Sequence, residues 1–170
     1  GARRKPTAGL VPMGHLYLSA AHKSSGKTTI AIGLCRALRA RGLQVQPFKK
    51  GPDYIDPMWV GQAAGRACFN LDFNTSSRAQ ILAAFGRELW GADLGLVEGN
   101  VGLYDSTDLE GKNSNAEMAK LLGSPVVLVL DAQGMARGVA PLLLGYQAFD
   151  RALRIGGVIL NKVGGQRHED

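Results

Sequence analysis

Five short apolar runs recur along the chain and alternate with stretches of helical periodicity. The runs are Leu16–Ala21, Gln44–Lys50, Leu94–Glu98, Val126–Asp131 and Gly157–Lys162. The fourth run shows no polar alternation, which is typical of a strand buried on both faces of a sheet. Strands that alternate with helices favour a parallel sheet with helices on both faces. The pattern therefore predicts a single α/β domain.

The stretches between the runs predict four helices. They span Thr28–Arg41, Ser76–Trp90, Asn115–Leu122 and Met135–Phe149. Gly42 follows the first of them, where a helix end favours a left-handed residue. Asn113 or Ser114 is expected to cap the third helix. Pro141 lies either in the first turns of the last helix or at a break in it.

Composition narrows the class of protein. A length of 170 residues with 45% apolar and 20% charged residues fits one globular domain. The net charge of +6 favours anionic partners, but no nucleic-acid reader motif accompanies it, so we expect no nucleic acid partner. No apolar run reaches the roughly 18 residues that a bilayer span needs. A cytoplasmic protein without a membrane partner is the expectation.

Two other features are less informative. Residues 1–15 contain no apolar signal core, and we expect a flexible lead-in to a domain over 16–170. Cys35 and Cys68 are the only cysteines, and they have no zinc-type spacing. Cys35 lies on the apolar side of a predicted helix and is interpreted as a small buried thiol. The role of Cys68 is left open.

The segment between the first run and the first helix predicts a phosphate-binding loop. It reads Ala-His-Lys-Ser-Ser-Gly-Lys-Thr-Thr over residues 21–29. Loop N–H groups and the helix N-terminus favour phosphate there, with Lys27 on the β- and γ-phosphates and the Thr28 hydroxyl on Mg²⁺. Ala21 replaces the usual first glycine, which requires a negative φ at that position. The expected nucleotide contacts are Ser24, Ser25, Gly26, Lys27, Thr28 and Thr29.

Charged residues follow two further runs, at the edge where open α/β sheets bind ligands. Glu98 ends the third run, and its carboxylate suits Mg²⁺, directly or through water. Asp53 follows the second run in a Gly-Pro-Asp segment, so it is either a metal ligand or a turn residue. Because neighbouring strand residues point to opposite faces, only one of Lys49 and Lys50 is expected to reach the site. The other is interpreted as a solvated lysine.

Longer motifs extend this picture to a family. The string Phe-Lys-Lys-Gly-Pro-Asp-Tyr-Ile-Asp-Pro over 48–57, with Gly-Arg at 65–66 and Asn-Leu-Asp at 70–72, closely resembles the cobyrinic (and hydrogenobyrinic) acid a,c-diamide synthases. Glu-Gly-Asn-Val-Gly-Leu-Tyr-Asp over 98–105 and Gly-Val-Ile-Leu-Asn-Lys over 157–162 are similar to later segments of that family. The likeness spans about residues 16–168. It implies a P-loop NTPase fold of the dethiobiotin-synthetase type.

The resemblance also implies an activity. ATP phosphorylates a side-chain carboxylate of a tetrapyrrole polycarboxylate, and ammonia then displaces phosphate to form an amide. In this family the ammonia comes from glutamine, hydrolysed by a C-terminal amidotransferase domain that this chain lacks. A glutamine-hydrolysing amidoligase that uses ATP and Mg²⁺ is therefore the expected enzyme. The sequence leaves a homodimer open.

Residue roles follow from the same resemblance. Lys27 and Thr28 become phosphate and Mg²⁺ contacts, while Asp53 and Glu98 become metal ligands. Lys49 is expected to stabilise the transferring phosphoryl group or the substrate carboxylate. Asn161 matches the position that reads the adenine edge, with a plain strand-end polar residue as the alternative. The residues expected toward the tetrapyrrole are Tyr54, Asp56 and Asp72.

Some positions depart from the family pattern. Met58-Trp59 stands where polar or histidine-bearing residues are usual, and Tyr104-Asp105-Ser106 replaces a more usual Asp-Gly ending. The variant pattern is similar to sirohaem-amidating relatives, in which Trp59 would stack on a different macrocycle. The alternative for Trp59 is an ordinary exposed or core tryptophan.

Two other functions stay open at this point. One is a regulatory ATPase switch of the partitioning type, which carries a lysine where this loop has His22. Lys23 is one residue late for that role. The other is a nucleotide-binding module without chemistry.

Overall fold

A computed structural model describes residues 14–23 and 25–164, which form six strands and five helices. The strands are β1 (Gly14–Ala20), β2 (Val45–Lys50), β3 (Phe69–Leu71), β4 (Leu94–Gly102), β5 (Val126–Asp131) and β6 (Ile155–Asn161). The helices are α1 (Lys27–Ala40), α2 (Asp56–Ala64), α3 (Arg78–Leu89), α4 (Asn115–Leu122) and α5 (Val139–Phe149).

The strands form one sheet in the order β3-β2-β4-β1-β5-β6, with every neighbouring pair parallel. This confirms the predicted α/β fold. Parallel strands end at the same edge of the sheet, so β1, β2 and β4 deliver their C-terminal residues to one place. The register aligns Lys49 of β2 with Glu98 of β4, which brings two charged residues side by side.

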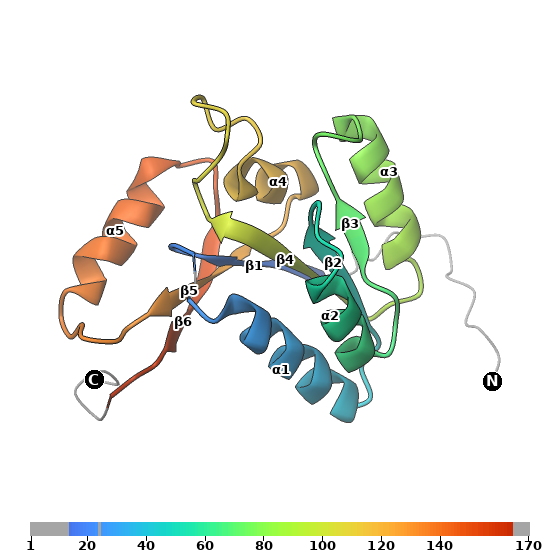
Figure 1. Cartoon of the computed structure of the whole chain (residues 1–170), viewed down its shortest axis with the longest axis horizontal. Coiled ribbons are helices and arrows are strands. Elements are labelled where there is room, and N and C mark those ends of the chain that lie inside the picture. The colour runs from blue at the N-terminus through green and yellow to red at the C-terminus, as the bar shows by residue number, and fades with distance from the viewer. Residues whose placement is uncertain (1–13, 24, 165–170) are drawn as a thin grey trace.

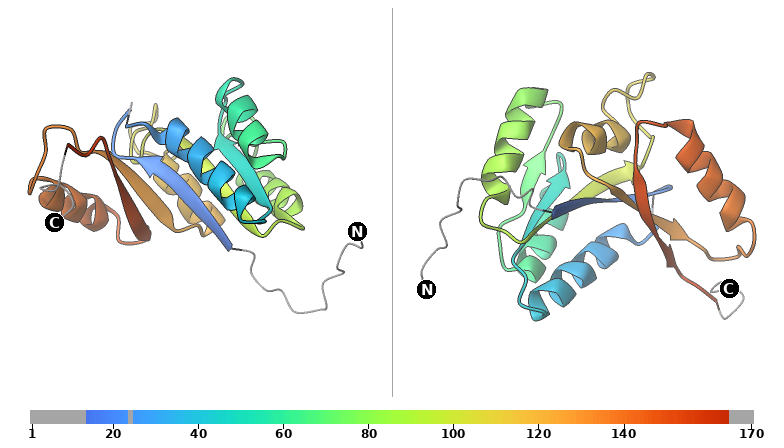
Figure 2. Two further views of the ribbon diagram at one scale, coloured as in Figure 1. Left: turned by 90° about the horizontal axis from the view of Figure 1, so that it is seen from below. Right: turned by 180° about the vertical axis from the view of Figure 1, so that it is seen from behind.

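Helices cover both faces of the sheet (Figure 1; Figure 2 gives the edge and back views). On one face, α1 and α2 pack around Leu18, Val45 and Leu96. On the other, α3, α4 and α5 pack around Tyr17 and Phe48. The two clusters alternate along each strand as the two-residue period requires. The phosphate loop and α1 therefore belong to the same side of the sheet as α2.

Helix α4 has the predicted bounds, whereas α1, α3 and α5 differ from their predicted bounds by one to four residues at one or both ends. Ser114 caps α4 by accepting a hydrogen bond from the Glu117 N–H. Pro141 lies in the first turn of α5, where a missing N–H does no harm. Gly42 has the predicted positive φ, at +83°. Among the described residues, no helix combines the length and apolar character needed to cross a bilayer.

Two elements were not predicted, α2 and β3. Gly51-Pro52 and Asp56-Pro57 favoured a turn, yet Pro57 lies in the first turn of α2, a position that proline tolerates. Strand β3 has three residues and lies at the sheet edge, so it shows no periodicity. Helix α2 matters for function because its first residue reaches the site described next.

Candidate functional site

The loop after β1 bends tightly around the start of α1. Gly26 immediately precedes the helix with φ +85°, a conformation that suits glycine. The Ser25 hydroxyl donates to the His22 carbonyl at 2.8 Å and braces the turn. Residues of this loop and the first turn of α1, together with Val101, line a cavity of about 190 Å³. The helix N-terminus and its free N–H groups open into that space, which suits an anion.

Ala21 avoids the positive φ that would be strained for an alanine at the first position of the phosphate loop. Among the described residues, only Val101 and Lys162 are non-glycine residues with positive φ, so Ala21 is unstrained. Its N–H donates to the Val129 carbonyl at 3.1 Å, and its carbonyl accepts from the Tyr146 hydroxyl at 2.6 Å. The loop therefore starts from a firmly held alanine.

Lys49 lies at the centre of a charged cluster beside the loop. Its ammonium donates to Glu98 Oε1 at 3.0 Å, to Asp56 Oδ2 at 3.3 Å and to the Gly99 carbonyl at 3.1 Å. The Asp53 carboxylate lies 3.8 Å away. The cluster thus gathers residues from β2, β4 and the start of α2. It contains Lys49 and three of the four carboxylates that the sequence singled out.

Thr28 and Lys27 join this cluster from the start of α1. The Thr28 hydroxyl donates to Glu98 Oε1 at 2.7 Å and to Asp56 Oδ2 at 3.2 Å. The Lys27 ammonium lies 3.8 Å from Glu98 Oε1. Burial lowers the pKa of Lys27, and the nearby Lys49 charge lowers it further, while Glu98 acts in the opposite sense. An anion in the loop would relieve the repulsion between the two ammonium groups.

Glu98 is the most deeply buried member of the cluster. Its side chain is 0% exposed, and all its close contacts fall on Oε1. Oε2 has no hydrogen-bond partner among the described residues, which is costly for a buried carboxylate oxygen. Together with the Thr28 hydroxyl, this oxygen supplies the hard ligands that Mg²⁺ prefers.

The described residues contain no group of three or more His, Cys, Asp or Glu arranged to hold a metal by themselves. Mg²⁺ at nucleotide sites is usually bound by one or two protein ligands, with phosphate oxygens and waters completing the shell. Thr28 and Glu98 fit that pattern. The Thr28 hydroxyl and the Glu98 carboxylate are therefore compatible with a Mg²⁺ that a bound nucleotide would bring.

Asp53 and Asp56 hold the start of α2 against the loop. Asp53 Oδ1 accepts from the N–H groups of Ile55 and Asp56 at 3.0 and 3.2 Å, so it caps the turn that begins the helix. Its other oxygen faces Lys49. Asp53 therefore has the turn role that the sequence left open, and its role as a metal ligand stays a prediction. The resemblance placed Asp56 toward the tetrapyrrole, whereas its carboxylate lies in the cluster because α2 begins there.

Lys50 and Asp72 lie on the opposite face of the sheet. The expectation of a solvated second lysine is wrong, since Lys50 is only 7% exposed. Its ammonium contacts Asn100 Oδ1 at 3.4 Å and lies over the Phe73 ring. Asp72 Oδ1 accepts from the Asn74 N–H and shapes the turn after β3. Neither side chain joins the cluster around Lys49.

The remaining predicted residues occupy different places. Asn161, at the end of β6, donates to the Ser25 carbonyl at 3.0 Å, so it supports the loop, and its adenine contact stays a prediction. Tyr54 is 79% exposed. Thr29 lies at the exposed start of α1, lining the cavity. Ser24 lies outside the described residues.

Asn115 is a positioning residue that the sequence analysis missed. It is fully buried at the start of α4, and its amide donates to the carbonyls of Asn100 and Gly102. Its carbonyl oxygen accepts from the Tyr17 hydroxyl at 2.7 Å and from the Asn100 N–H. These bonds hold the segment that follows Glu98. A buried asparagine at a helix start was the available signal, since it has to find partners there.

Comparison of the sequence with known proteins also indicates a nucleotide-binding domain. The family model for the CobQ/CobB/MinD/ParA nucleotide binding domain matches residues 20–170. Cobyrinate a,c-diamide synthase of Magnetococcus marinus is 54% identical over 154 residues, covering 91% of this chain and 33% of the relative. Hydrogenobyrinate a,c-diamide synthase of Rhodobacter capsulatus is 48% identical, covering 91% of this chain and 36% of the relative. The chain thus spans about a third of the length of these curated relatives.

Solved structures share the fold at low identity. Cell division protein FtsY of Thermotoga maritima superposes with a TM-score of 0.62 at 16% identity, covering 88% of this chain and 52% of that one. The signal recognition particle 54 kDa protein of Aeropyrum pernix gives a TM-score of 0.59 at 19% identity, covering 97% and 39%. At these identities the likeness concerns the fold alone. The chain belongs to the CobQ/CobB/MinD/ParA nucleotide-binding domain family, and its curated relatives confirm the resemblance to the cobyrinic acid a,c-diamide synthases.

Proposed function

We propose that this chain is the ATP-dependent half of an amidoligase that amidates side-chain carboxylates of a tetrapyrrole. The names of its relatives favour cobyrinate or hydrogenobyrinate as the acceptor, and sirohaem remains the alternative suggested by Met58-Trp59. The observation that carries the proposal is the cluster around Lys49, which joins phosphate-loop residues to buried carboxylates.

The cluster suits transfer of a phosphoryl group to a carboxylate. In this proposal Lys27 holds the β- and γ-phosphates, while Thr28 and Glu98 would hold Mg²⁺, which neutralises phosphate charge when bound. Lys49 stands where its ammonium stabilises charge on the transferring group. A carboxylate oxygen of the acceptor attacks the γ-phosphorus, the bond to the bridging oxygen breaks, and ADP leaves. Ammonia then attacks the acyl carbon, phosphate departs, and the nitrogen loses a proton to give the amide.

The use of glutamine as the source of ammonia is also part of the proposal, and we assign its hydrolysis to a partner domain. Neither Cys35 nor Cys68 is suited to act as the nucleophile of a glutaminase, because burial raises the pKa of these thiols to about 11 and about 12. An amidotransferase partner domain is therefore proposed, and free ammonium is expected to replace it in an assay.

The regulatory switch is less well supported. At the position where such ATPases carry their lysine, the His22 ring contacts the Lys23 carbonyl at 2.8 Å. The family model includes proteins of that type, so it does not separate the two functions. The relatives that match at 46–54% identity are named as synthases.

Phosphate release from Mg·ATP in the presence of ammonium chloride tests the proposal. Cobyrinate, hydrogenobyrinate and sirohaem are added in separate arms. One macrocycle is expected to stimulate release and to gain an amide detectable by mass spectrometry. Lys27→Ala should abolish both signals, whereas Arg87→Ala, on the exposed surface of α3, serves as the matched control.

Intact ATP binding without stimulation by any macrocycle would contradict the tetrapyrrole assignment. Stimulated phosphate release without amide formation would contradict the ligase chemistry. Macrocycle-independent ATP hydrolysis that responds only to protein concentration would favour the dimerising switch.

A further inference from the structure

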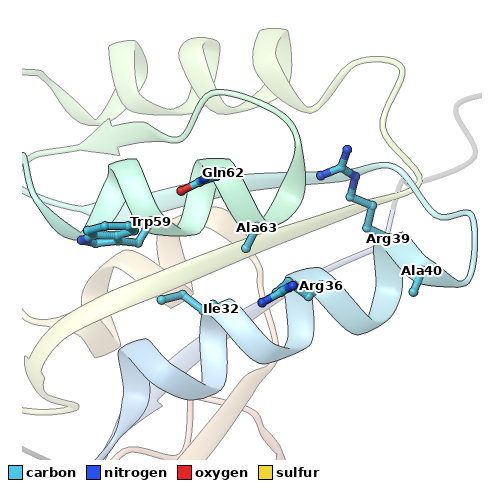
Figure 3. Close-up of a pocket in the computed structure, with 7 residues that line it drawn as sticks. All are labelled: Ile32, Arg36, Arg39, Ala40, Trp59, Gln62 and Ala63. Atoms are coloured by element: carbon cyan, nitrogen blue, oxygen red, sulfur yellow. The ribbon is translucent and has the colours of Figure 1, made fainter.

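A groove of about 700 Å³ lies between α1 and α2, separate from the phosphate cavity. Ile32 and Arg36 of α1 face Trp59 and Ala63 of α2 across it (Figure 3). Its size is within the range of small-molecule sites. The two helices that form it are the same two that bring Thr28 and Asp56 to the reaction centre.

The groove begins one helical turn from that centre. On α1, Ile32 follows Thr28 by four residues, and Arg36 follows by eight, so these side chains share one stripe of the helix. Along the axis, Arg36 lies about 12 Å and Arg39 about 16 Å beyond Thr28. On α2, Trp59 follows Asp56 by three residues. A ligand in the groove would therefore lie with one end at the phosphoryl group.

The groove carries uncompensated positive charge. Within the described part of the chain, neither Arg36 nor Arg39 forms an ion pair. The Arg39 guanidinium lies against Gly65, at the far end of α2, where a Cβ on the glycine would approach it to 2.8 Å. Guanidinium groups bind carboxylates with two parallel hydrogen bonds. This end of the groove thus suits an anionic group remote from the reaction.

The near end of the groove is apolar and exposed. Ile32, Trp59 and Ala63 line this end, and Trp59 is 55% exposed. Tyr54, Ile55 and Met58, in the five residues before Trp59, are also exposed, and several exposed apolar side chains in the segment that contributes Asp56 to the cluster favour a binding surface. Trp59 offers a flat aromatic face, and Met58 an adaptable one.

We propose that the α1–α2 groove binds the macrocycle of the acceptor, with the ring on Trp59 and its non-reacting carboxylates on Arg36 and Arg39. The inference rests on the proposed function and specifies where the acceptor lies. A large ring that carries several carboxylates matches both the apolar near end and the cationic far end. The reacting carboxylate then reaches Lys49, and the distant carboxylates select the ring orientation that presents it.

The test measures how phosphate release depends on the concentration of the macrocycle in the presence of ammonium. It uses the macrocycle that stimulates the wild-type chain. Arg36→Gln, Arg39→Gln and Trp59→Leu are each expected to raise the KM for the macrocycle about tenfold, the factor associated with a lost charged hydrogen bond or aromatic contact. The KM for Mg·ATP is expected to stay the same. Arg87→Gln and Trp90→Leu are matched exposed controls on α3 and at its C-terminal end.

A direct binding measurement supplements the kinetics. The chain has two tryptophans, so Trp90→Phe leaves Trp59 as the sole indole. Addition of the macrocycle should quench its fluorescence, and Arg36→Gln should shift the quenching curve to higher concentration. Urea unfolding of each variant verifies that the exposed substitutions leave the fold intact.

The possible outcomes separate the two proposals. Unchanged macrocycle KM in the groove variants, with stimulation intact, would overturn the groove and leave the proposed function standing. Lack of stimulation in the wild-type chain would overturn both. A groove variant that alters the sedimentation of the protein, but not the macrocycle KM, would assign the groove to a second copy of the chain and overturn the inference.

Discussion

Replacing Lys49 with methionine tests whether the buried charge cluster is built as described. The substitution keeps an unbranched side chain of similar length and removes the ammonium that contacts Glu98 at 3.0 Å and Asp56 at 3.3 Å. Glu98 is 0% exposed and cannot turn to water, so its charge loses its closest partner. We expect the free energy of unfolding to fall by about 3 kcal/mol, as for other broken buried pairs.

The magnitude follows from two opposing contributions. At an effective dielectric constant of 20, the attraction between charges 3.0 Å apart is about 5.5 kcal/mol. The substitution also relieves the repulsion between the Lys49 and Lys27 ammonium groups, and Lys27 still lies 3.8 Å from the same Glu98 oxygen. Burying the Lys49 ammonium also has a desolvation cost that the variant no longer bears. The net loss is therefore smaller than the direct attraction.

Urea unfolding followed by circular dichroism measures this loss. Adding Glu98→Gln to Lys49→Met removes the unpaired charge and should recover most of the stability, so the two changes are strongly non-additive. Arg87→Met, which breaks the exposed pair with Glu88, should change stability by less than about 1 kcal/mol. A stable Lys49→Met chain, or additive effects of the two changes, would refute the described cluster.

Three further predictions follow from the same geometry. Gly26→Ala places a Cβ against the Asn161 amide at φ +85° and should abolish Mg·ATP binding in a calorimetric titration, whereas Gly33→Ala, in open space within α1, should bind normally. Burial acts to raise the pKa of Asp56, but the charge and hydrogen bond of Lys49 hold it below its usual value. Its contribution to stability is therefore complete above about pH 4 and lost as the pH falls through the lower folded pKa, so Asp56→Asn should flatten the acid limb of the unfolding free energy measured from pH 5 to 2. Burial raises the pKa of Cys35 to about 11 and of Cys68 to about 12, so both thiols should resist iodoacetamide at pH 8 until urea unfolds the chain, and rapid labelling of the native protein would contradict this.

Most of the sheet could be predicted from the sequence because its strands are buried on both faces. Continuous apolar runs such as the one that forms β5 have few other interpretations. The phosphate loop was equally readable, since its glycine, lysine and threonine lie between a strand and a helix. The strand runs and the phosphate loop are each recognised from residues that are neighbours in the sequence.

The missed features depend on partners that are distant in sequence. Asp56 joins the cluster only because α2 starts next to α1, and the Asp-Pro pair at its start is compatible with both a turn and a helix. Lys50 is buried and its ammonium lies over the Phe73 ring, and no local pattern in the sequence predicts that contact. Asn115 likewise finds its partners 13 to 98 residues away.

The separation of Thr28 and Glu98 along the chain sets the order in which the site assembles during synthesis. The phosphate loop and Lys49 leave the ribosome early, but Glu98 follows 70 residues after Thr28, and β1 has to receive β4 as its neighbour before that carboxylate arrives. An elongating chain that ends before β4 therefore contains the phosphate loop without the Glu98 carboxylate, which we propose as a Mg²⁺ ligand. If the proposed function holds, ATP use would be confined to molecules in which the central strands have already paired.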